Sequence, residues 1–186
     1  MFDRGYKTWC EKYSTDKRKA LGIPAAGALD TRKLADSLGV IVRTPRDVPG
    51  LAEGALGVLL RNDGTPSCWS AVTLVRGTRM VVILNSSHSL ARQASDLTHE
   101  LAHIIRGHAA QEVDISAEGL MLLKSYDKLQ EEEADWLSGC LLLPRDALIS
   151  IKRRRLEQGE AASDYGVSIQ MLNYRLARTG VNRQFA

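Results

Sequence analysis

Cysteine is scarce in this sequence, and long runs of apolar residues are absent. The three cysteines are widely separated and form no C-x-x-C pair, which argues against a disulfide framework and favours reduced thiols that pack in the interior. The first residues lack the apolar continuity of a signal peptide or a membrane span. The sequence therefore predicts a cytoplasmic protein that does not associate with a membrane.

An excess of charge of one sign is absent as well. Lys and Arg number 25 against 22 Asp and Glu, a net charge of +3, which is far from the concentrated basic charge of a dedicated nucleic-acid binder. The chain has no internal repeat and no low-complexity tract, and its 44% hydrophobic and 25% charged residues are ordinary for a globular protein. We expect one compact domain with a small helical appendage, and no direct binding to nucleic acid.

Helical patterns at both ends of the chain enclose a region of short β-branched runs. Residues 6–21 predict one helix, and a second begins after Asp30 or Thr31 and ends at Gly39. Turn-forming residues between the β-branched runs favour an antiparallel meander over β-α-β crossovers. The order of helices, strands and helices predicts an α+β fold. The runs that predict strands are residues 40–42, 56–60, 70–75 and 80–84.

Residues 89–107 predict a further helix, which carries an H-E-x-x-H motif. Its histidines, His99 and His103, stand four positions apart and so share one helix face, where both imidazoles can reach one metal ion. Glu100 lies beside them, where its carboxylate can take a proton from a water molecule at the ion. This spacing is typical of zinc peptidases, so we expect one Zn²⁺ per chain and Glu100 as the catalytic base.

A catalytic zinc ion needs a third protein ligand. His108 suggests the metzincin motif H-E-x-x-H-x-x-G-x-x-H, but Gly107 and His108 each stand one position out of that register. A carboxylate-rich helix that begins near residue 131 offers Glu131, on a flank of small residues that allows close approach to the histidine helix. Glu133, on the opposite flank, is the competing candidate. Asp135 is expected to accept the outer N–H of a ligating histidine.

Peptide hydrolysis also needs a hydrogen-bond donor to the developing oxyanion. His108 and Tyr126 are candidates for this donor, with His88 and Arg92 as further ones. If the strand at 80–84 lies at a sheet edge, it can align an extended substrate by main-chain pairing.

The C-terminal part of the chain predicts short helices. A helix at 145–156 carries a basic run, and two more helices flank the turn at 166–168. We expect a peptidase domain at 1–150 and a helix-turn-helix-like extension at 151–186 packed on it. This extension leaves an alternative open, a DNA-binding or repressor-binding regulator with a vestigial metal site, whose DNA affinity would fall with salt. A third hypothesis is a partner that holds a repressor without cutting it.

Taken together, these motifs resemble the ImmA/IrrE family of metallopeptidases, a gluzincin-like group with H-E-x-x-H, E-x-E-A-[ND] and L-L-x-P motifs. The resemblance implies a zincin-like fold, in which a small antiparallel or mixed sheet packs on the H-E-x-x-H helix and a glutamate-bearing helix. It also implies His99, His103 and Glu131 as zinc ligands and Glu100 as base. The matching segments are 84–85, 92–93, 98–108, 131–135, 142–144, 165–168 and 174–176, with a fainter match at 29–42.

The resemblance further implies a function in transcriptional regulation. Members of this family are bacterial or phage-borne cytosolic endopeptidases that typically cleave a helix-turn-helix repressor and so switch on stress-response or mobile-element genes. Some members carry an N-terminal DNA-binding domain that this sequence does not show, so the expected partner is a separate repressor protein. Asp135 stands where many members have asparagine, which leaves the ligand set intact and changes the hydrogen bond to the imidazole.

Overall fold

The computed structural model describes residues 2–61, 63–64, 67, 69–108, 113–115, 121–123 and 127–185. Its helices and strands confirm the predicted α+β class. The α-helices are α1 (Tyr6–Ala20), α2 (Thr31–Ser37), α3 (Glu53–Leu59), α4 (Leu90–Arg106), α5 (Lys128–Leu142), α6 (Arg145–Arg154), α7 (Gln158–Asp164) and α8 (Ile169–Thr179). The strands are β1 (Val40–Arg43), β2 (Ala71–Arg76), β3 (Arg79–Leu84), β4 (Val113–Ile115) and β5 (Met121–Leu123), and the 3₁₀ helices are η1 (Pro45–Asp47) and η2 (Val181–Gln184).

The three-stranded sheet is mixed, with the order β1-β3-β2. Strand β2 pairs with β3 antiparallel, as the turn residues between them predict, whereas β1 pairs with β3 in parallel. The predicted meander is therefore wrong for β1, because a crossover that contains α3 separates it from the other two strands. The short strands β4 and β5 pair with each other in a separate ladder.

The segment 56–60 was predicted to be a strand, and this prediction is wrong. It lies in and just after α3, where Leu56 is buried, Leu59 and Leu60 are half-buried, and Val58 is 64% exposed. Those inward positions follow the i, i+3, i+4 spacing of a helix face. A short apolar run carries both periodicities at once, so its helix and strand interpretations are hard to separate by sequence.

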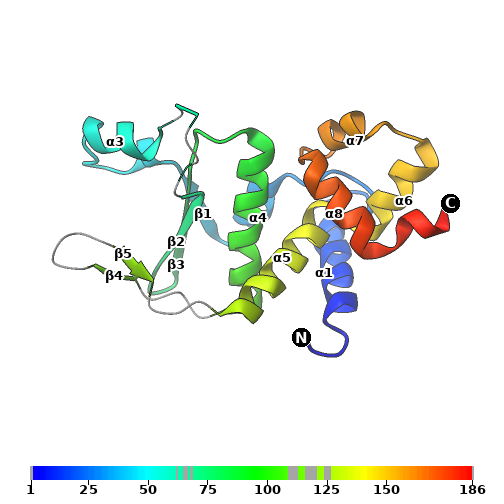
Figure 1. The fold of residues 1–186 in the computed structure, drawn as a ribbon. Coiled ribbons are helices and arrows are strands. Elements are labelled where there is room, and N and C mark those ends of the chain that lie inside the picture. The colour runs from blue at the N-terminus through cyan, green and yellow to red at the C-terminus, as the bar shows by residue number, and fades with distance from the viewer. Residues whose placement is uncertain are drawn as a thin grey trace.

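Helix α4 stands between the sheet and α5 (Figure 1). It confirms the helix predicted at 89–107: Ser89 accepts the backbone N–H of Arg92 at the start, and Gly107 ends the helix in the left-handed conformation. Leu97 and Leu101 are buried in a core that also receives side chains from β3 and α5. Helix α5 begins at Lys128, earlier than the sequence suggested, because the carboxylate of Asp127 caps its first backbone N–H groups.

Helix α1 lies against α5 (Figure 1). Buried polar contacts join the two helices. The hydroxyl groups of Tyr6 and Ser14 donate to backbone carbonyls of α5 at 2.6 and 2.7 Å. Cys10 and Cys140 are buried and unbridged, as predicted for packing thiols, while Cys68 lies outside the described residues.

A second hydrophobic core begins where α5 ends. Leu142 and Leu143 pack there with the inward faces of α6, α7, α8 and η2. The domain boundary expected at residue 150 falls within α6, and the two short helices expected around Gly166 are α7 and α8. In the part of the chain that the structure describes, no helix has the length and apolar character needed to cross a membrane.

Candidate metal centre

His99, His103 and Glu131 converge between α4 and α5. One potential ligand atom from each side chain lies within 4.8 Å of the others. Nε2 of His99 is 3.0 Å from Nε2 of His103 and 3.2 Å from Oε2 of Glu131, and Nε2 of His103 is 3.6 Å from Oε1 of Glu131. One helical turn separates the histidines on α4, and α5 presents the glutamate to them, so the cluster follows directly from the packing of these two helices.

The spacing of these atoms is compatible with one bound zinc ion. Bonds of about 2.0 to 2.1 Å at tetrahedral angles place ligand atoms about 3.4 Å apart. The two Nε2 atoms are 3.0 Å apart, and they lie 3.2 and 3.6 Å from different oxygens of Glu131. Two imidazoles and one carboxylate are also the donor set of several catalytic zinc sites, which keep a fourth position open for water. The three side chains are between 21% and 25% exposed, so the cluster is in contact with solvent.

The outer nitrogen of each histidine has its own partner. Nδ1 of His99 lies 3.0 Å from Oδ1 of Asp135, the contact that the sequence predicts. Burial lowers the pKa of His99, but the hydrogen bond to Asp135 and the surrounding carboxylates outweigh it and raise the pKa overall. Burial and the neighbouring His99 lower the pKa of His103, which favours its neutral, ligating form.

Glu133, the competing ligand candidate, faces a different set of groups. Its Oε2 lies 3.0 Å from Nε of Arg106 and 3.1 Å from Nε2 of His108, and its side chain is 8% exposed. His108 in turn places Nδ1 at 2.9 Å from Nδ1 of His103. Glu131 therefore lies beside the Nε2 atoms of the two histidines, which we call the inner side of the pair. His108 lies beside Nδ1 of His103, and Glu133 lies beyond His108; this is the outer side of His103.

Glu100 is half-buried at the sheet side of α4. Its carboxylate accepts a short hydrogen bond from the hydroxyl of Thr73 on β2. Burial raises the pKa of Glu100, and the hydrogen bond from Thr73 opposes that rise. The sequence gives no signal for Thr73, since an ordinary strand threonine becomes a partner of Glu100 only once β2 packs on α4.

The other oxyanion-donor candidates have these positions. His88 is paired with Asp96 at 3.2 Å, and Arg92 donates to the hydroxyl of Ser70 at 3.0 Å. Tyr126 lies outside the described residues.

The segment 80–84 is β3, the central strand of the described sheet, so the condition for a substrate-aligning edge at this strand is not met. The strand next to Glu100 that has an edge in the described sheet is β2. Its residues Leu74 and Val75 are 50% and 54% exposed. Because β1 pairs with β3, β3 is the central strand and β2 lies at an edge of the described sheet.

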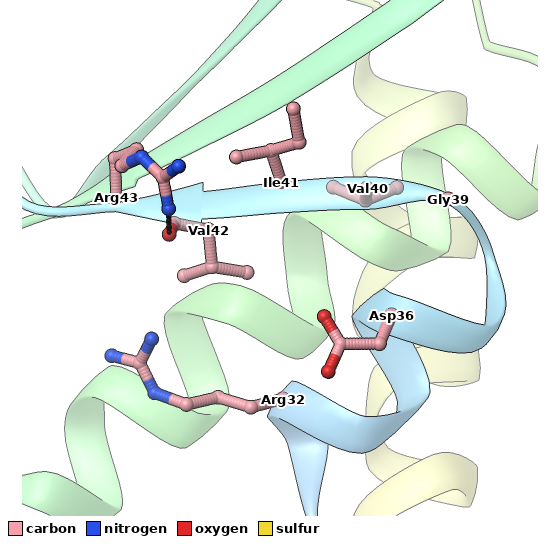
Figure 2. A pocket seen from close by; sticks show the side chains of 7 residues that line it. All are labelled: Arg32, Asp36, Gly39, Val40, Ile41, Val42 and Arg43. Atoms are coloured by element: carbon pink, nitrogen blue, oxygen red, sulfur yellow. Dashed lines mark hydrogen bonds between the residues drawn. The ribbon is translucent and has the colours of Figure 1, made fainter.

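A surface hollow of about 490 Å³ lies at the opposite edge of the sheet, along β1 and α2. Figure 2 shows Arg32 and Asp36 of α2 on the side of β1 to which Val42 points, whereas Ile41 points to the other side. None of its lining residues belongs to the cluster of His99, His103 and Glu131. The hollow is therefore separate from the cluster at the junction of α4 and α5.

The cluster lies in a part of the chain that matches a known family. A family model described as the IrrE N-terminal-like domain, a peptidase family, matches residues 58–177. The match covers more than half of the chain and contains α4 and α5 in full. No curated protein matches the chain.

Proposed function

We propose, from the premise that the chain belongs to the ImmA/IrrE peptidase family, that it is a zinc-dependent endopeptidase. His99, His103 and Glu131 would hold one zinc ion, with Asp135 supporting His99. The observation that carries the proposal is the convergence of two imidazole nitrogens and a carboxylate within 4.8 Å. The small mixed sheet beside α4 and the glutamate on α5 are also consistent with the zincin-like fold that the resemblance implies.

Glu100 is the proton carrier of the proposed reaction. A bound zinc ion would supply Lewis-acid chemistry, acidifying a water molecule and polarising the scissile carbonyl. Glu100 accepts the proton of the attacking water and returns it to the leaving amine. The raised pKa of Glu100 brings it closer to neutral pH, which favours transfer in both directions. Thr73 fixes the carboxylate through its hydroxyl group.

Strand β2 is the proposed guide for the substrate. An extended peptide that pairs with its edge runs past Thr73, and so past the carboxylate that Thr73 holds. Such main-chain pairing does not require a free N- or C-terminus of the substrate, because the bound peptide can continue beyond both ends of β2. This geometry supports cleavage inside a polypeptide.

The proposed substrate is a helix-turn-helix repressor of bacterial or phage origin, cut in the cytoplasm to relieve repression. Support for it comes from the family resemblance of the motifs at 98–108 and 131–135. The helices α7 and α8 around Gly166 would form a helix-turn-helix-like extension of the peptidase.

The test is a comparison of the wild-type chain with Glu100→Gln. The variant should bind one zinc ion per chain, because its metal ligands are intact. Its cleavage rate should fall by about 100-fold to 10,000-fold, because the group that accepts the proton is absent. Metal analysis and cleavage of a candidate repressor measure the two properties separately.

Wild-type turnover in Glu100→Gln would contradict the mechanism. A chelator-insensitive protein with salt-dependent affinity for DNA would instead favour the regulator with a vestigial site.

A further inference from the structure

Two buried side chains, His108 and Glu133, lie on the outer side of the His103 ring. We propose that they are positioning residues that hold His103 in the tautomer that binds a metal through Nε2. The inference rests on the proposed function, because it concerns what supports a ligand and not the ligand itself.

Close contacts join the groups into one chain. His108 Nδ1 lies 2.9 Å from His103 Nδ1, and His108 Nε2 lies 3.1 Å from Oε2 of Glu133. The side chains of His108 and Glu133 are 7% and 8% exposed, so water has little access to these contacts. Arg106 binds the same carboxylate oxygen at 2.9 Å and lies over two aromatic rings of α1, which fixes Glu133 in turn.

Only one arrangement of protons satisfies this chain with neutral rings. An ionised carboxylate accepts hydrogen bonds and cannot donate them, so the ring proton of His108 must be on Nε2, facing Glu133. Nδ1 of His108 is then an acceptor, and Nδ1 of His103 must carry the proton that it accepts. This leaves the lone pair of His103 on Nε2, the nitrogen that faces His99 and Glu131.

The end of α4 places His108 for this role. Gly107 has φ 64°, in the left-handed region, and the next backbone N–H donates to the carbonyl of His103 at 3.0 Å. The chain thereby turns back, and the two rings meet edge to face with centroids 5.0 Å apart. The position of His108 in the sequence does not match the metzincin motif, but it brings the ring to Nδ1, the outer nitrogen of His103.

The decisive substitution is Glu133→Leu, which removes the acceptor and keeps a side chain of similar size. Nε2 of His108 then has no carboxylate to donate to, so the proton order of the chain is no longer imposed. Zinc affinity, measured by competition with a chromophoric chelator, should fall by roughly 10-fold to 100-fold. His108→Leu should reduce it at least as much.

A rescue variant separates positioning from mere packing. In His108→Gln the amide must donate to Glu133, so its oxygen faces His103 and accepts the Nδ1 proton as before. This variant should recover most of the zinc affinity that His108→Leu loses. In the metal-free protein, ¹⁵N NMR should show the proton of His103 on Nδ1 in wild type and His108→Gln, and mixed tautomers in His108→Leu and Glu133→Leu.

His88→Leu is the matched control. His88 is equally buried, at 7% exposed, and also pairs with a carboxylate, that of Asp96. Its removal should lower stability without changing zinc affinity by more than about twofold. A wild-type chain that binds no zinc would refute the proposed function. A wild-type chain that binds zinc, with unchanged affinity and tautomers in Glu133→Leu, would overturn this inference alone.

Discussion

Glu131 and Glu133 are two positions apart on α5 and have different surroundings. The oxygens of Glu131 lie 3.2 and 3.6 Å from the inner nitrogens of His99 and His103. Glu133 is bound to Arg106 and His108 at the outer side of the cluster. Two helical positions correspond to a rotation of about 200°, so the two carboxylates cannot exchange places without unwinding the turn.

Alanine substitutions should separate the two glutamates. Glu131→Ala should empty the site, because only two protein ligands remain and the loss exceeds the roughly 10-fold to 100-fold effect of an outer partner. Glu133→Ala should still load zinc at micromolar or higher metal, with weakened affinity. Metal analysis of both purified variants checks this, and zinc retained in the first but lost in the second would transfer the ligand role to Glu133.

At the scale of elements, α1 and α5 are joined through the buried guanidinium of Arg18. It donates to the carbonyls of Leu141 and Leu142 at 2.7 and 3.3 Å, where α5 ends and its carbonyls lack helical partners. Burial lowers the pKa of Arg18 to about 10, so the group stays charged at neutral pH. The guanidinium therefore acts as a cap on α5 supplied by another helix.

Replacing this cap should destabilise the fold. Arg18→Met leaves at least two buried carbonyls without a donor, which should lower the free energy of unfolding by about 3 kcal/mol or more. Lys12→Met is the control on the exposed face of the same helix, where the lysine is 74% exposed, and should change stability by less than about 0.5 kcal/mol. Urea unfolding of both variants measures the difference, and equal midpoints would contradict this account of Arg18.

The same scale shows what sequence reasoning can reach. The pair His99 and His103 is visible in the sequence because one helix turn sets its geometry. The choice of Glu131 depends on which face of α5 meets α4. In the structure this glutamate lies beside His99 and His103, on the face that the sequence analysis favours. The contact of Thr73 with Glu100 depends on how β2 packs, which no local pattern encodes. The parallel pairing of β1 was missed for the same reason, since tertiary contacts select the strand partner.

At the scale of the whole molecule, the proposed ligands tie α4 to α5, two helices that also share the first hydrophobic core. An ion bound only by the folded state stabilises that state by mass action, by about 2.7 kcal/mol at a metal concentration 100 times Kd. Chelation should therefore lower the melting temperature by about 5 to 10 °C for a chain of this size. Calorimetry with and without chelator checks this, and Glu131→Ala should show no such shift.

The contacts of α1 also determine which fragment of the chain is suitable for recombinant expression. The family match starts at residue 58, so a recombinant fragment cut to that segment would lack the helix that covers α5. The carbonyls that Tyr6, Ser14 and Arg18 satisfy would then face solvent beside exposed apolar side chains such as Leu137 and Leu141. We therefore expect a fragment without residues 6–20 to fold poorly, and expression vectors for the peptidase-family segment should be designed to retain them.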